Sequence, residues 1–133
     1  MEFIDFYRSY WFPFLNLSAI FLITGGLLVL SKRKWPTHHS LSASILTFIF
    51  VVFFLSIEFY TIDLYFVKKL ESFDLDGNGV FSADERTEQQ KKYFNIVMYD
   101  AGRFLAPFFI AFLSIGYAIF IFFSVKLFYF FKK

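Results

Sequence analysis

The sequence contains no cysteine and few charged residues for its length. Asp, Glu, Lys and Arg together make up 18% of the 133 residues. The absence of cysteine excludes disulfide scaffolds, thiolate metal sites and thiol catalysis. A typical soluble domain carries about 25% charged residues, so the chain has too few charges for a small soluble domain. The net charge of +2 is too small to indicate nucleic-acid binding.

Sequence motifs that mark common enzymes are also missing. The chain contains no G-x-S-x-G, no H-E-x-x-H and no phosphate-binding loop. An integral membrane enzyme needs several polar groups that converge on one site, and the sequence offers no such set. We therefore predict that the protein is not an enzyme.

Apolar residues dominate instead, at 58% of the chain, and 24 of them are Phe. A helix needs about 20 mainly apolar residues to cross a hydrocarbon core of roughly 30 Å. Three uncharged runs reach that length, and we place the spans at approximately 13–31, 40–58 and 104–126. Small residues in each span, such as Thr24, Ser44 and Ala118, predict where the helices contact one another. The sequence thus predicts an all-α integral membrane protein with three transmembrane helices.

The basic residues indicate the orientation in the membrane. The link between the first two spans contains Lys32, Arg33 and Lys34 and no acid, and the segment after residue 125 contains three lysines and no acid. By the positive-inside rule, the first loop and the C-terminus face the cytoplasm. The N-terminus and the long link between spans two and three then lie outside a plasma or inner membrane. The same first loop contains His38 and His39, which could bind a metal or sense pH, but we expect both to be solvated.

Twelve residues of the long link follow a metal-binding pattern. From Asp74 to Glu85 the sequence reads DLDGNGVFSADE, which fits D-x-[DN]-x-[DN]-G followed by five residues and a Glu. This segment resembles the EF-hand calcium-binding motif, as a single hand over residues 66–85. A Ca²⁺ ion takes six to eight oxygen ligands at about 2.3–2.6 Å, which a tight loop can supply from alternate residues. The predicted ligands are Asp74, Asp76, Asn78, Val80 through its backbone carbonyl, Ser82 directly or through water, and Glu85 through both carboxylate oxygens.

The predicted flanks of the loop differ in how well they fit the family. Residues 58–73 contain no Gly or Pro, so span two should continue as a helix into the hand, with Phe66, Leu70 and Phe73 on one face. A polar helix should follow from about residue 83 to 99, and its apolar residues return only at Tyr93. Pro107 should lie in the first turn of span three or kink it. The domain organisation expected is one membrane domain, 1–133, with an extramembrane EF-hand insertion at approximately 60–99.

These features predict a small calcium-binding integral membrane protein. We expect a structural or regulatory subunit of a larger membrane complex or homo-oligomer, because three short spans form a thin bundle with little interior. Its partners would be membrane lipids and other membrane subunits or copies of itself, without nucleic acid. Calcium could be structural, regulatory or absent from the loop. The alternative function is a calcium-modulated oligomeric ion channel, although the spans offer few polar residues to line a pore.

Overall fold

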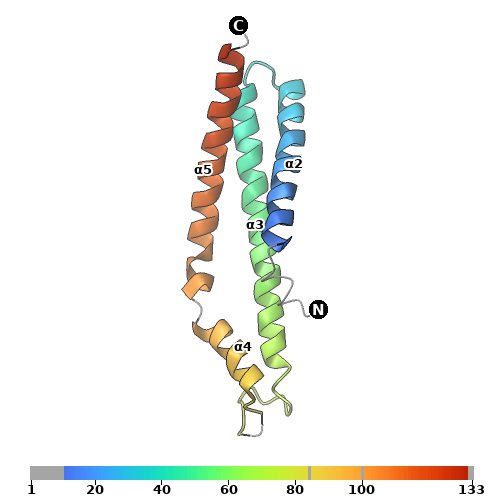
Figure 1. The fold of residues 1–133 in the computed structure, drawn as a ribbon, viewed down its shortest axis with the longest axis vertical. Coiled ribbons are helices and arrows are strands. Elements are labelled where there is room, and N and C mark those ends of the chain that lie inside the picture. The colour runs from blue at the N-terminus through green and yellow to red at the C-terminus, as the bar shows by residue number, and fades with distance from the viewer. Residues whose placement is uncertain (1–10, 84, 100, 132–133) are drawn as a thin grey trace. The chain divides into compact units, whose positions relative to one another are not determined.

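The computed structural model describes residues 11–83, 85–99 and 101–131. Within these ranges the chain forms four helices and no strand: α2 (Trp11–Lys34), α3 (His39–Glu71), α4 (Glu88–Tyr99) and α5 (Ala101–Phe131) (Figure 1). Three of them, α2, α3 and α5, are long and apolar enough to cross a membrane. The all-α fold with three long apolar helices is therefore confirmed.

The long helices extend beyond the predicted spans. As expected from the absence of Gly and Pro, α3 continues past residue 58 and ends at Glu71. Helix α5 begins at Ala101, so Pro107 lies inside it and not in its first turn. Proline has no amide hydrogen, so the helix lacks the bond that residue 107 would donate to the carbonyl of Arg103.

Two compact units make up the chain, and helices α3 and α5 each contribute to both. The first unit contains α2, the part of α3 up to Val51 and the part of α5 from Ser114. The second unit is Val52–Leu113, which includes the loop between α3 and α4. Each unit is described by itself below.

A small apolar cluster lies where the helices of the first unit meet. Ala43, Ile121 and Val125 form a buried cluster, against which Leu28 and Tyr117 pack.

Hydroxyl groups link the same helices. The Ser44 hydroxyl on α3 donates a hydrogen bond of 2.7 Å to the carbonyl of Ala118 on α5. The Tyr117 hydroxyl lies 3.3 Å from Oγ1 of Thr24 on α2. The predicted contact residues Thr24, Ser44 and Ala118 therefore do lie at helix contacts, where a small side chain permits approach and a hydroxyl adds a hydrogen bond.

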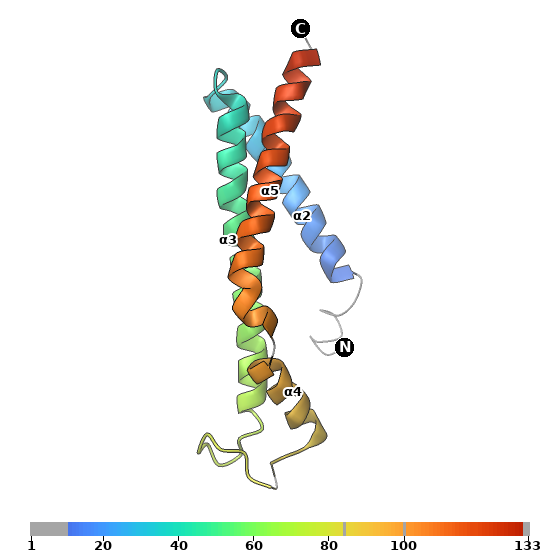
Figure 2. The ribbon, with the colours of Figure 1, turned by 90° about the vertical axis from the view of Figure 1, so that its left-hand side faces the viewer.

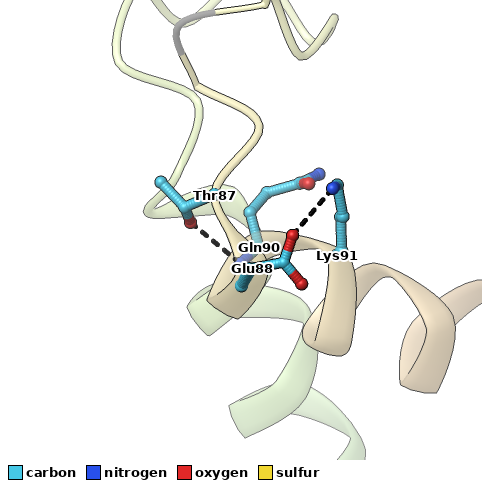
Figure 3. Close-up of polar contacts among 4 residues, drawn as sticks. All are labelled: Thr87, Glu88, Gln90 and Lys91. Carbon is cyan, nitrogen blue, oxygen red and sulfur yellow. Dashed lines mark hydrogen bonds and ion pairs between the residues drawn. The ribbon is translucent and has the colours of Figure 1, made fainter.

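In the second unit, the helix after the loop begins later than predicted. It starts at Glu88 and not at about residue 83. Thr87 caps it, because its Oγ1 accepts a hydrogen bond of 3.1 Å from the amide of Gln90, and Glu88 pairs with Lys91 at 2.8 Å (Figure 3). A threonine that accepts an N3 amide is a standard helix start, and it fixes the first residue of α4.

Aromatic packing joins α3 to α4. Tyr93 is buried, with its ring centroid 6.3 Å from that of Phe66 and 5.9 Å from that of Phe73, and Leu70 is buried as well. The apolar face predicted before the loop, which contains Phe66, Leu70 and Phe73, is thus the face on which Tyr93 of α4 packs. Although α4 is polar at its start, Tyr93 supplies the apolar contact about one turn later.

Candidate metal centre

Three carboxylates converge in the loop between α3 and α4. One oxygen each from Asp74, Asp76 and Glu85 can be chosen so that all three lie within 4.8 Å of one another. Two like unit charges 4 Å apart repel each other by about 1 kcal/mol even in bulk water. A bound cation would remove that repulsion, and these three residues are among the six predicted ligands.

Asp74 carries an oxygen with no donor. Its Oδ2 accepts a hydrogen bond of 2.8 Å from the amide of Gly79. Its Oδ1 is buried, and among the described residues no donor contacts it. A buried carboxylate oxygen without a partner is unfavourable, so this atom can gain from a cation in the loop.

Glu85 is held in place by the two ends of the loop. Its Oε1 accepts the amide of Leu75 and its Oε2 accepts the amide of Ser82, each at 2.7 Å. The residue is only 5% exposed. The hydrogen bonds from the amides of Ser82 and Leu75 lower the pKa of Glu85 below its ordinary value of 4.5, because they stabilise the charged form. The last position of the loop is therefore an ionised carboxylate at neutral pH.

The other predicted ligands lie in the same loop. The Asn78 side chain donates to Oδ2 of Asp76 at 2.5 Å and accepts the Val80 amide at 2.6 Å. Ser82 is exposed and contacts Glu85 through its amide. Asn78 and Ser82 are thus each bonded to one of the three carboxylate residues. The assignment of all six residues as ligands stays a prediction.

Two glycines give the loop its shape. The φ angle of Gly79 is +78°, the left-handed conformation that fits the sharp reversal predicted at this position. Gly77 also has a positive φ, of +70°, although the sequence pattern alone did not single it out. Side chains with a Cβ adopt this region at a cost, so both positions favour glycine.

The far side of the loop rests on α4. The Phe81 ring meets that of Phe94 edge to face, with centroids 6.2 Å apart, and the carbonyl of Phe81 accepts a hydrogen bond of 3.1 Å from Nε of Arg86. The ring contact ties the second half of the loop to α4, while the hydrogen bond lies within the segment that leads into that helix.

The donor set is chemically suited to calcium. Each predicted ligand would bind the ion through an oxygen atom, which Ca²⁺ and Mg²⁺ prefer. No predicted ligand carries sulfur or imidazole. An oxygen of Glu85 that accepts one amide keeps a second lone pair, so it can also bind a cation. The residues therefore fit the ion that the resemblance implies.

The structure corrects one expectation about the first loop. His38 is exposed, as predicted for a solvated residue, but His39 is buried. Its Nδ1 lies 3.0 Å from the Ser31 hydroxyl, and its ring meets that of Tyr129 edge to face. The only sequence signal was its place at the start of an apolar run, where a residue on the inward face of the helix packs against the other helices.

Comparisons with protein-family models, curated proteins and solved structures found no match to this chain.

Proposed function

We propose that the chain is a small calcium-binding integral membrane protein that serves as a structural or regulatory subunit of a membrane complex or homo-oligomer. The observation that carries the proposal is the convergence of Asp74, Asp76 and Glu85 within 4.8 Å. The buried, donor-free Oδ1 of Asp74 supports it further. The six predicted ligands would bind one Ca²⁺, with Glu85 closing the coordination shell.

Calorimetry on the detergent-purified chain tests the calcium site. We expect saturable binding in the range of about 10⁻⁴–10⁻³ M, typical of extracellular modules, and its loss in Glu85→Gln. The matched control is Glu88→Gln, because Glu88 is exposed and lies just outside the loop. That variant should bind as the native chain does. No saturable heat at several millimolar calcium, or equal loss in both variants, contradicts the proposal.

A distance measurement distinguishes a structural calcium ion from a regulatory one. Tyr60 and Met98 are both exposed in the second unit, and the chain has no native cysteine. Spin labels on a Tyr60→Cys, Met98→Cys variant therefore report only on these positions. A distance that changes with calcium supports a regulatory ion that moves α3 relative to α4. A change in elution volume would show that assembly responds as well. An unchanged distance with a raised thermal midpoint supports a structural ion.

The orientation that we propose places the calcium loop and the N-terminus outside, and the first loop and the C-terminus in the cytoplasm. The positive charges of the first loop support it. Single-cysteine labelling provides the test, with Gln89→Cys in α4 and Thr37→Cys in the first loop. An impermeant maleimide should label residue 89 in intact cells and residue 37 only after permeabilisation, and the reverse pattern would contradict the proposed orientation.

The burial of hydroxyl groups supports a subunit over an ion channel. Thr24, Ser31, Thr47 and Ser114 are all nearly inaccessible. A pore formed between copies requires a row of polar side chains on the outer surface of the spans. The four buried hydroxyls do not supply one, and the exposed Ser56 and Ser124 lie on different helices.

A further inference from the structure

A cavity of about 320 Å³ lies among the helices of the first unit. Its walls are largely apolar and include Leu28 on α2 and Ile121 and Phe128 on α5. Its polar lining residues are Lys32, His39, Ser124 and Tyr129. Its volume lies within the range of about 300–1,000 Å³ found for ligand sites, which are mostly apolar with a few placed polar groups.

Hydrogen bonds and ring contacts hold the polar wall of this cavity in place. The Ser31 hydroxyl donates to the carbonyl of His39 and lies 2.6 Å from the Ser42 hydroxyl, which ties the end of α2 to the start of α3. The His39 ring then meets Tyr129 of α5, with centroids 5.6 Å apart. A second hollow of about 200 Å³ shares His39 and Tyr129 as lining residues and is also lined by Lys126. A lysine therefore lines each of the two adjoining hollows.

The charges around the cavity have one sign. Residues 11–51 and 114–131 contain no Asp or Glu, whereas Lys32, Arg33, Lys34 and Lys126 are all basic. In Figures 1 and 2, the connection between α2 and α3 and the last turns of α5 lie at the same end of the first unit. The counter-charge for these lysines must therefore come from outside the described part of this unit.

We propose that this cavity binds an anionic phospholipid, with its phosphate at Lys32 and one acyl chain along the apolar wall. Basic pockets between membrane helices bind anionic headgroups, and the apolar lining provides a surface for a chain that a free phosphate does not have. Lys126 lines the neighbouring hollow that shares His39 and Tyr129 with this cavity, and in the proposal it adds a second positive charge beside the headgroup.

Native mass spectrometry of the full chain in a neutral detergent tests the proposal. The probes are phosphatidylglycerol, phosphatidylcholine with the same acyl chains and inorganic phosphate. We expect phosphatidylglycerol to bind more tightly than phosphatidylcholine, and inorganic phosphate to compete only weakly. Lys32→Gln should weaken phosphatidylglycerol binding about fivefold, which corresponds to about 1 kcal/mol for one basic residue near a lipid surface.

Two further variants separate a built site from general attraction to a basic surface. Lys34→Gln removes the same charge, but Lys34 lines neither hollow, so the lipid binding of this variant should stay unchanged. Ser124→Phe adds bulk at a lining position without changing the charge and should reduce binding of both lipids. Equal loss in Lys32→Gln and Lys34→Gln, equal binding of the two lipids, or full competition by inorganic phosphate would overturn the proposal. Because no calcium is added, the result is independent of the proposed calcium site.

Discussion

Asp63 on α3 forms an ion pair with Arg103 on α5, although 40 positions separate them in the sequence. Nη2 of Arg103 lies 2.9 Å from Oδ2 of Asp63, and Nη1 donates to the carbonyl of Val97 at the end of α4. The two side chains are 23% and 30% exposed. One guanidinium thus joins the three helices of the second unit.

Removing the acid of this pair should destabilise the second unit. In Asp63→Asn, the half-buried guanidinium of Arg103 loses its counter-charge, at an expected cost of about 1–3 kcal/mol. Thermal unfolding in detergent measures the loss. Glu88→Gln removes an exposed ion pair by the same chemical change, and surface pairs of that kind contribute little. Equal midpoints for the two variants would show that the Asp63–Arg103 pair does not stabilise the fold.

Acid should loosen the loop between α3 and α4 through Glu85. Because its pKa in the folded chain is lower than 4.5, its stabilising effect is complete above about pH 4.5 and is lost as the pH falls through the lowered value. We expect the amide signals of Leu75 and Ser82 to shift together in that range in nuclear magnetic resonance spectra. In Glu85→Gln, the same two amides should show no such transition. A transition that survives the substitution would assign it to another carboxylate.

Replacing Gly79 should strain the loop without a steric clash. A Cβ at this position meets no atom within 4 Å, but φ is +78°. Gly79→Ala should therefore destabilise the loop by about 1–2 kcal/mol, measured as faster hydrogen exchange over residues 74–85. Gly116→Ala is the control, since its Cβ also meets nothing within 4 Å and its backbone is helical. Unchanged exchange in Gly79→Ala would mean that the loop readily adopts another conformation.

The cap of α4 should determine where that helix begins. Thr87→Ala removes the acceptor for the Gln90 amide and should cost about 1 kcal/mol. Hydrogen exchange in the first turn of α4 should become about fivefold faster. Thr87→Ser keeps the hydroxyl and should restore slow exchange. If serine and alanine behave alike, the hydroxyl does not hold the helix start.

The sequence by itself determined the features that depend on neighbouring residues. Long uncharged runs predict helices that can span a membrane, because length and apolarity are local properties. The oxygens of Asp74, Asp76 and Glu85 lie in one twelve-residue segment, so a tight loop alone brings them together. The continuation of α3 beyond residue 58 also followed from a local property, the absence of helix breakers.

Tertiary structure decided what depends on which faces meet. The pairing of Asp63 with Arg103, the burial of His39 against Tyr129 and the cover that Tyr93 gives to Phe66 join residues far apart in the chain. Helical periodicity shows that a helix has an apolar face but does not specify which helix covers it. The start of α4 was misplaced for a related reason, since Glu85 bonds back to the amides of Leu75 and Ser82 and the helix begins only after the Thr87 cap.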